Sequence, residues 1–286
     1  MSIAEGNVLG IDVGWSEKQE SSAVCRLSWN KDSINWRVCR FRANDDDRRN
    51  TIHDVAGTNK ILAVAIDGPL RRNFDEIERY RSAERVLSRG ELLKRIGKPG
   101  QSSSPNGKKL NWQANLAATT VKDWCEVGDA SHDQAIDEYA VVEAFPTSFL
   151  GVMVRCPERL SAGERSDRYF GHLDGHEGPD RSLSQLIECL LGPKSWEKHI
   201  HSLTNHDDRA AFVCAITGLC IACGEYTAVG DSRDGWIILP PKWAFEEWAW
   251  EAIVANLKRE QGERHRKASL LCYEDYRLRA MGEDEK

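Results

Sequence analysis

Three strand-length runs of apolar residues, widely separated in the chain, set the strongest constraint on its fold. They are NVLGIDVG (7–14), ILAVAIDGPL (61–70) and EYAVVEAFP (138–146). A run that is apolar at nearly every position is typical of a strand covered on both faces. The segment between the first two runs is long enough for a crossover helix, so we expect these strands to be parallel. Strands that alternate with helices predict an α/β fold with a mixed sheet.

The other segments predict further strands and helices around this sheet. SAVCRLSW (22–29) and INWRVCRF (34–41) predict a hairpin, and a helix is expected at about 111–126. TNHDDRAAFVCAITGLCIACGEY (204–226) is apolar almost all round and rich in small residues, which indicates a buried helix packed closely on the sheet. GWIILPP (235–241) predicts a short strand that ends at the prolines.

The chain has no obvious linker, so we expect a single domain over residues 1–286 with a core at about 7–241. A helical insertion is expected at about 147–203. An aromatic amphipathic helix is expected at about 242–260. Its tryptophans indicate either core packing or the seam of a homodimer, and they are Trp243, Trp248 and Trp250.

Within the insertion, the residues divide into two types. Residues 161–180 are polar and predict a loop, whereas 182–191 and 195–203 predict helices. Beyond the amphipathic helix, residues 274–286 predict a frayed terminus.

Charge is unevenly distributed along the chain. The net charge of −6 gives no overall basic field of the kind that binds nucleic acid. Residues 71–109, however, carry 11 Lys and Arg against 5 Asp and Glu. This segment is either a solvated helix face or a functional element, which would be a phosphate-contacting surface or a mobile lid. Because a local basic surface can bind phosphates even in an acidic protein, the net charge does not exclude binding to nucleic acid.

The cysteines and the N-terminal residues bear on the compartment. Nine cysteines are scattered through the chain, and one pair, Cys220 and Cys223, has CxxC spacing. Because this pair lies in an apolar helical run without a second pair, we expect buried core thiols, with a zinc or redox site as the alternative. The chain opens without a signal-peptide pattern, and no apolar run reaches the ~18 residues of a membrane span. We therefore expect a cytoplasmic protein with reduced thiols and no membrane partner.

Carboxylates recur where the predicted strands end. Asp12 lies in the first apolar run, Asp67 ends the core of the second, and Glu143 lies near the end of the third. Asp207 and Asp208 fall in the first turn of the predicted buried helix. Because parallel strands bring their carboxyl ends to one edge of a sheet, we expect these acids to converge there.

A cluster of carboxylates predicts a metal site. Like charges that lie close together raise one another's pKa, and Mg²⁺ or Mn²⁺ would relieve that repulsion. Two such ions can activate water and stabilise the leaving oxygen of a phosphodiester. Each acid also has a simpler interpretation: a turn for Asp12 and Asp67, an arginine partner for Glu143, and the helix dipole for Asp207 and Asp208.

Five blocks of sequence resemble a known family. VLGIDVGW, AVAIDGPL, VVEAFPTSFLG, HDDRAAFVCAITG and GWIILPP occur in this order. They resemble domain-of-unknown-function family 429, a set of predicted nucleases with the RNase H fold, over residues 7–241. The resemblance implies an α/β fold with a five-stranded mixed sheet flanked by helices, whose first three strands are antiparallel. It also implies Asp12 on the first strand and Asp67 on the fourth.

That arrangement is similar to the RuvC-like resolvases, which cleave phosphodiesters with two Mg²⁺ ions. Many members of family 429 carry an aspartate within the last helix, where this chain has RAAF. Here Asp207 and Asp208 stand just upstream of that position.

We therefore predict a metal-dependent nuclease that hydrolyses DNA or RNA by a two-metal-ion mechanism with Mg²⁺ or Mn²⁺. The predicted catalytic residues are Asp12, Asp67, Glu143, Asp207 and Asp208. The predicted metal ligands are Asp12, Asp67, Glu143 and Asp208. The predicted substrate contacts are Arg71, Arg72, Arg165, Arg168 and His206.

Two other functions stay open at this stage. A protein of the same fold could bind nucleic acid or act as a scaffold without cutting. GIDVG (10–14) also suits the first phosphate loop of actin-like and sugar-kinase-like ATPases, although no second glycine-rich loop is evident.

Overall fold

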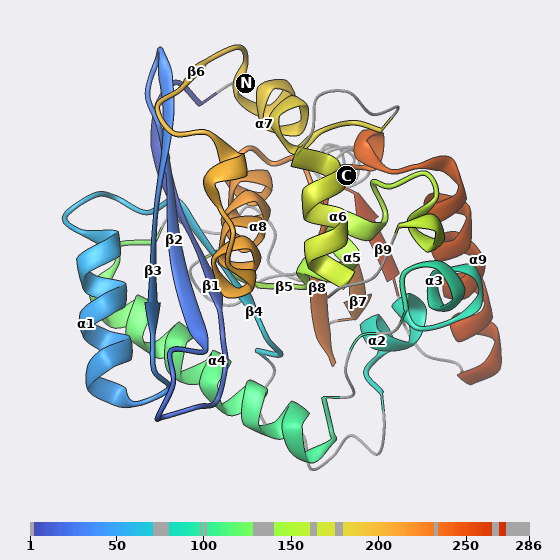
Figure 1. Cartoon of the computed structure of the whole chain (residues 1–286). Coiled ribbons are helices and arrows are strands. Elements are labelled where there is room, and N and C mark those ends of the chain that lie inside the picture. Colours follow the sequence, from blue (N-terminus) through green and yellow to red (C-terminus); the bar gives the residue numbers. More distant parts are fainter. Residues whose placement is uncertain are drawn as a thin grey trace, which may run out of the picture.

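The computed structural model describes most of the chain (Figure 1). The described residues are 3–70, 80–97, 99, 102–127, 140–160, 165–174, 180–231, 234–264 and 269–272. Their strands form one mixed sheet with helices on both faces. The predicted α/β class is therefore confirmed.

The described residues contain nine strands in a single sheet. The strands are β1 (Gly6–Asp12), β2 (Ser22–Trp29), β3 (Ser33–Phe41), β4 (Ala63–Asp67), β5 (Val141–Ala144), β6 (Ser195–Trp196), β7 (Thr227–Asp231), β8 (Gly235–Leu239) and β9 (Ser269–Cys272). Their order across the sheet is β6-β3-β2-β1-β4-β5-β8-β7-β9. The first three strands are antiparallel, whereas β1, β4, β5 and β8 are parallel. The predicted hairpin and the predicted parallel pairing of the first two apolar runs are both present.

The sheet is wider than the five strands that we predicted. Strand β7 pairs antiparallel with β8, and β9 pairs antiparallel with β7. The two-residue β6 adds to the opposite side, beside β3. The sequence TAVGD of β7 is short and contains a glycine and an acid, so it lacks the composition that identifies a strand.

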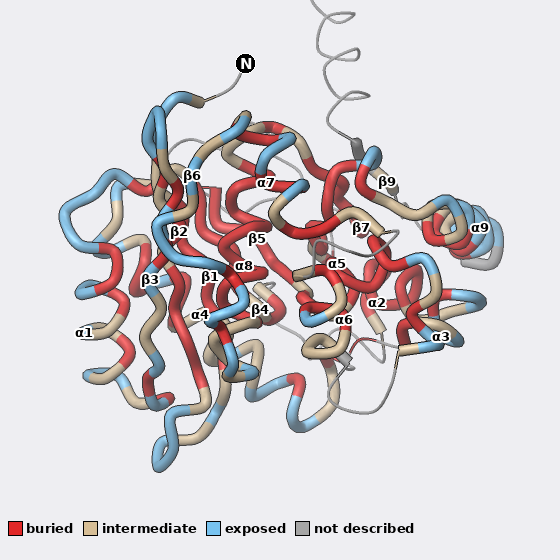
Figure 2. The backbone as a smooth tube through the Cα atoms, turned by 45° about the horizontal axis from the view of Figure 1, so that its top comes forward, coloured by how far each residue is buried: buried red, intermediate tan, exposed pale blue. Residues whose placement is uncertain are grey.

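Helices cover both faces of the sheet. They are α1 (Asp45–Ala56), α2 (Ser82–Leu87), α3 (Gly90–Arg95), α4 (Pro105–Trp124), α5 (Pro146–Gly151), α6 (Arg165–Asp174), α7 (Leu183–Leu191), α8 (His206–Ala222) and α9 (Glu247–Arg264). Short 3-10 turns are η2 (Pro157–Arg159), η3 (Ile200–Ser202) and η4 (Lys242–Ala244). Helix α8 packs on β1, β2 and β4 from one side, and its middle is buried all round (Figure 2). Helices α1 and α4 pack on the other side. Among the described helices, none is both long enough and apolar enough to cross a membrane.

The insertion differs from the prediction in two places. The predicted helix at 195–203 is instead β6 followed by η3. The segment predicted as a loop contains α6, whose Tyr169, Phe170 and Leu173 are buried against the core. These three apolar residues form a narrow stripe, and most residues around them are charged or polar. The hydrophobic periodicity of the segment was therefore too weak to predict a helix. Residues 274–286, predicted to fray, lie outside the described residues.

The helix predicted at about 242–260 begins later, at Glu247, so Trp243 lies in η4 and only Trp248 and Trp250 lie in α9. All three tryptophans make contacts within the chain. Trp243 donates a hydrogen bond to Glu225 over 3.2 Å, and Trp248 donates one to the Val154 carbonyl over 3.0 Å. The ring of Trp250 packs edge-on against Phe245. These contacts favour intrachain packing as the reason for the aromatic pattern, and a homodimer seam stays a prediction.

The thiols of the CxxC pair are free. Cys220 is buried and Cys223 is half-buried, and neither forms a disulfide. Burial raises the pKa of the Cys223 thiol to about 12 and that of Cys220 well above its ordinary value. Protonated, buried thiols agree with the predicted core role.

Close approach of α8 to the sheet depends on Gly10. A Cβ atom added at Gly10 would overlap the backbone nitrogen of Ala215 and the carbonyl oxygen of Ala211. The absence of a side chain at Gly10 therefore lets the backbone of α8 lie directly against β1.

We expect Gly10→Ala to destabilise the fold by about 3 kcal/mol or more, because the added methyl group meets backbone atoms that cannot move independently. The matched control is Gly218→Ala on the same helix, where an added Cβ would lie 3.4 Å from Val8 and from the Leu9 carbonyl, at ordinary contact distance. The control should be neutral or should gain up to about 1 kcal/mol in helix propensity. Denaturant unfolding of both variants measures the difference, and equal stabilities would contradict the packing described here.

Candidate metal centre at the acidic edge

Strands β1 and β4 place two aspartates side by side. Asp12 is the last residue of β1, Asp67 is the last residue of β4, and the two are direct partners in the parallel register. Gly10 and Ala65, two positions earlier, face α8 and its core. Because side chains alternate between the faces of a strand, both carboxylates project to that same face. Adjacent strands lie about 4.8 Å apart, so these carboxylates are close neighbours.

The first turn of α8 adds two more carboxylates. The Asn205 side chain caps this helix and accepts hydrogen bonds from the N–H groups of Asp207 and Asp208, over 2.9 and 3.3 Å. Both aspartates precede Ala211 by one helical turn, so they lie on the stripe that packs against β1. We call this set of four carboxylates the acidic edge: Asp12, Asp67, Asp207 and Asp208.

The carboxylates of the acidic edge disfavour one another's charge. Burial raises the pKa of Asp12 well above its ordinary value, and the carboxylates of Asp67 and Asp207 raise it further. Burial, together with the charge of Glu143, raises the pKa of Asp67 to about 7. Burial also raises the pKa of Asp208. A divalent cation would relieve these unfavourable interactions.

Asp208 has a carboxylate oxygen that the protein leaves partly unsatisfied. Its Oδ1 lies 3.6 Å from Nε of Arg40, a contact too long for a hydrogen bond. That oxygen is buried and accepts no hydrogen bond from the described part of the chain. An unsatisfied buried oxygen is unfavourable by itself, so it fits the role of a cation ligand. The sequence did not identify Arg40, because nothing in the pattern of β3 marks it as a neighbour of α8.

Glu143 projects to the other face of the sheet. In the parallel register of β4 and β5, Glu143 is the partner of Ile66, and Asp67 is the partner of Ala144. Because a shift of one residue reverses the face, Glu143 points away from the face that carries Asp67. The prediction that Glu143 converges with the aspartates is therefore wrong. The partner of Asp67 on β5 is Ala144, and Glu143 lies one residue before it.

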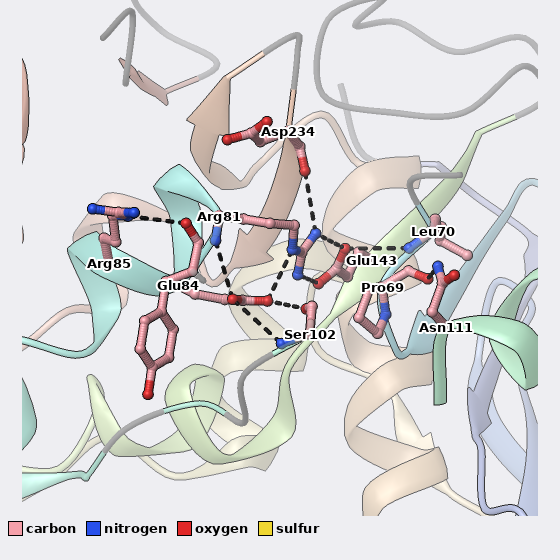
Figure 3. A network of polar contacts seen from close by, with 10 residues as sticks. Pro69, Leu70, Arg81, Glu84, Arg85, Ser102, Asn111, Glu143 and Asp234 are labelled. Atoms are coloured by element: carbon pink, nitrogen blue, oxygen red, sulfur yellow. Dashed lines mark hydrogen bonds and ion pairs between the residues drawn. The ribbon is translucent and has the colours of Figure 1, made fainter. Parts of the chain in front are cut away.

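Glu143 instead pairs with a buried arginine (Figure 3). Arg81, only 1% exposed, donates hydrogen bonds to both carboxylate oxygens of Glu143, over 2.7 and 2.5 Å. It also donates to Glu84 over 2.9 Å, and Ser102 donates to the same carboxylate. The backbone N–H of Leu70 donates to Glu143 over 3.4 Å. This geometry favours the arginine-partner interpretation, so we leave Glu143 out of the proposed ligand set.

Two of the predicted substrate contacts, and the side chain of a third, lie outside the described residues. Arg71 and Arg72 belong to the undescribed segment 71–79, and Arg165 lies in α6 without a described side chain. Arg168 donates a hydrogen bond to the Leu160 carbonyl over 3.0 Å, which gives it a structural contact.

His206 begins α8 and lies next to the acidic edge in the chain. Its side chain is half-exposed, and its Nδ1 atom lies 3.3 Å from Oδ1 of Asp167 on α6. Arg209 Nη1 reaches the same oxygen over 3.4 Å. Asp167 thus lies within ion-pair distance of a half-exposed imidazole beside the first turn that carries Asp207, and its Oδ1 atom accepts no hydrogen bond from the described residues. The substrate-contact role of His206 stays a prediction.

The carboxylates are arranged as neighbouring pairs. Across the part of the chain that the structure describes, no three His, Cys, Asp or Glu side chains are close enough to enclose a metal. Mg²⁺ usually binds through one or two protein carboxylates and completes its shell with water and phosphate oxygens. The neighbouring carboxylates of Asp12 and Asp67 fit that kind of site, and Asp207 is the α8 carboxylate whose charge acts on Asp12.

Replacing Asp67 should change how stability depends on pH. The folded-state pKa of about 7 exceeds the ordinary value of 3.8, so the folded protein binds more protons than the unfolded chain between these values. Stability therefore falls as pH rises from about 4 to about 7. Asp67→Asn should remove this loss and gain up to about 4 kcal/mol at pH 8, with no gain at pH 4. Urea unfolding at the two pH values measures this difference, and an equal effect at both would contradict the raised pKa.

Comparison with known proteins identified no related protein. Neither the protein-family models, nor the curated proteins, nor the solved structures gave a match to the chain. The resemblance to family 429 therefore stays a prediction.

Proposed function

We propose that the protein is a metal-dependent nuclease that hydrolyses phosphodiester bonds at the acidic edge. The observation that supports this best is the direct pairing of Asp12 with Asp67 beneath a helix turn that carries two further carboxylates. A fold gains no stability from adjacent carboxylates whose charged forms are disfavoured. Perturbed groups of this kind are concentrated at functional sites.

The strand arrangement supports the same proposal. Strands β3, β2, β1, β4 and β5 are consecutive in the sheet, the first three antiparallel and the last two parallel to β1. This agrees with the layout that the resemblance to family 429 implies. We infer an RNase H-like core within the wider sheet, with Asp12 on its first strand and Asp67 on its fourth.

The residues of the acidic edge would have distinct roles in catalysis. Asp12 and Asp67 would hold Mg²⁺ or Mn²⁺ from the sheet, and the first turn of α8 would face the cation with Asp207, whose charge acts on Asp12, and with Asp208. The bound metal would supply Lewis acidity and a water of lowered pKa. The N-terminus of α8 presents the positive end of its dipole to a phosphate at this edge. His206, whose Nδ1 atom lies 3.3 Å from Asp167, would contact the phosphate from the rim of the site.

The test is a cleavage assay on the full chain with end-labelled single-stranded and double-stranded DNA and RNA. Each substrate is incubated with Mg²⁺, with Mn²⁺ and with excess EDTA. We expect metal-dependent cleavage of at least one substrate and none in EDTA. Binding without cleavage in every metal would contradict the nuclease proposal and favour a silent nucleic-acid-binding protein of the same fold. Tight ATP binding by calorimetry, with no cleavage, would favour the ATPase alternative.

A further inference from the structure

The row of residues that carries Asp67 and Asp12 continues across the sheet to a cation. Asp12 of β1 is the direct partner of Ala23 on β2, and Ala23 is the direct partner of Arg40 on β3. Direct partners on neighbouring strands project to the same face, so Arg40 lies on the face that carries the acidic edge. The order along this row is therefore Asp67, Asp12, Ala23, Arg40.

The spacing of this row places Arg40 beside the acidic edge. Neighbouring strands lie about 4.8 Å apart, so the backbone of Arg40 is about 10 Å from that of Asp12. Ala23 between them is small and buried, so β2 places no large side chain in the row. The guanidinium of Arg40 extends to the first turn of α8, since its Nε lies 3.6 Å from Oδ1 of Asp208. It therefore stands beside a phosphate held at Asp12 and Asp67.

The guanidinium of Arg40 is available to a ligand. Its side chain is 41% exposed, and it makes no hydrogen bond within the described part of the chain. The contact with Asp208 is an ion pair that is too long for a hydrogen bond. A planar guanidinium whose N–H donors are free suits the oxygens of a phosphate, which it binds through two parallel hydrogen bonds.

A second cation lies on the outer side of β3. Lys198 follows β6, and its Nζ lies 3.7 Å from the ring centroid of Trp36. The Trp36 indole donates a hydrogen bond to the Lys198 carbonyl over 3.1 Å, which fixes the lysine backbone beside β3. Burial raises the pKa of Asp208, whereas the charges of Arg40 and Lys198 lower it, so both cations lie close to that carboxylate. The acidic edge therefore has a positively charged flank on the β3 side.

We propose that Arg40, with Lys198 beyond it, binds the phosphate next to the one held at the acidic edge. The proposal rests on the proposed nuclease function, because a cation bound at the acidic edge fixes the first phosphate. The substrate strand then crosses the sheet from β4 toward β3, with its phosphates facing the first turn of α8. Contacts of this kind position a nucleic-acid strand without reading its sequence.

The test measures how binding to nucleic acid depends on salt while a divalent cation is present. Short fluorescein-labelled oligonucleotides, single-stranded and duplex, are titrated into the full chain in Ca²⁺, which binds carboxylate oxygens, over a series of KCl concentrations. Each phosphate contact contributes about 0.7–0.9 to the slope of log affinity against log salt concentration. Arg40→Gln should lower the magnitude of this slope by about that amount and weaken binding at least about tenfold. Arg40→Lys keeps the charge and should keep the slope.

The matched control is Arg37→Gln on the same strand. Arg37 is similarly exposed, at 45% against 41% for Arg40, and it also pairs with an aspartate, Asp54. Because an odd number of residues separates the two positions, Arg37 projects to the opposite face, toward α1. Arg37→Gln should therefore leave the salt slope unchanged and change the affinity less than twofold.

A stability measurement separates a phosphate contact from a structural role. A half-exposed ion pair at 3.6 Å adds little stability, so Arg40→Gln should unfold at nearly the same urea concentration as the wild type. Lys198→Gln alters an exposed side chain and covers the case in which Arg40→Gln fails to fold. It should also lower the magnitude of the salt slope.

The outcomes distinguish this proposal from the nuclease proposal. Cleavage by the wild type in Mg²⁺ or Mn²⁺, with equal salt slopes for Arg40→Gln and Arg37→Gln, would overturn the Arg40 contact and leave the nuclease standing. A slope that falls in Arg40→Gln and not in Arg37→Gln, without cleavage in any metal, would support the Arg40 contact and overturn the nuclease. Neither binding nor cleavage by the wild type would overturn both.

Discussion

Replacing Asp12 by asparagine should lower the metal-dependent cleavage rate about a thousandfold and should not unfold the protein. Asparagine keeps the shape of the side chain and removes the charge that we propose holds a cation between β1 and β4. Loss of ~4 kcal/mol of charge stabilisation in the transition state corresponds to about three orders of magnitude in rate. Single-turnover cleavage of the best substrate in Mg²⁺, with the wild type measured in parallel, gives the ratio.

The same variant should be more stable than the wild type in the absence of metal at pH 8. The raised pKa of Asp12 shows that its charged form is disfavoured by burial and by Asp67 and Asp207. A group with a raised folded-state pKa destabilises the fold above its unfolded value, so asparagine removes that penalty. A variant that loses both activity and stability would indicate a structural role for Asp12. A variant that retains full activity would remove Asp12 from the site.

Replacing Arg81 by methionine should have the largest effect on stability, about 3–5 kcal/mol. The guanidinium is 1% exposed and satisfies both Glu143, 62 residues away, and Glu84. Methionine keeps much of the volume but leaves two carboxylates buried without their cation, which is strongly destabilising. The loss should be greater at pH 8 than at pH 5, because protonation partly relieves a stranded carboxylate.

The control for this prediction is the same substitution at an exposed pair. Arg37 bonds Asp54 over 2.5 Å, and both side chains are well exposed, at 45% and 62%. Arg37→Met should therefore cost about 1 kcal/mol or less. Similar losses for the two variants, measured by urea unfolding, would show that the buried pair of Arg81 and Glu143 adds no more stability than an exposed pair.

The sequence alone was sufficient to predict the centre of the fold. The continuous apolar runs around Asp12 and Asp67 predicted two parallel, buried strands, and these strands are direct neighbours. The small residues of α8 predicted a helix packed tightly on the sheet, and Gly10 meets its backbone. In both cases the information lies in a local pattern, because burial on both faces leaves its own signature in the chain.

The role of Glu143 could not be predicted in the same way. Its strand is apolar on both faces, so alternation gives no indication of which face the glutamate occupies. Its partner Arg81 is distant in sequence and is one of 11 cations in a mixed segment, with nothing local to distinguish it. Pairings of this kind depend on the tertiary structure that brings Arg81, the N-cap residue of α2, to Glu143 of β5, and no local pattern encodes it.

The central claim is that the acidic edge binds a divalent cation through Asp12 and Asp67. Calorimetric titration of Mn²⁺ into metal-free protein at pH 8 tests it most directly, with Asp12→Asn, Asp67→Asn and the exposed control Asp54→Asn beside the wild type. We predict that the wild type and Asp54→Asn bind Mn²⁺ with equal affinity, and that each acidic-edge variant binds at least about tenfold more weakly. Equal Mn²⁺ affinity in all four proteins, or no binding by the wild type, would contradict the claim.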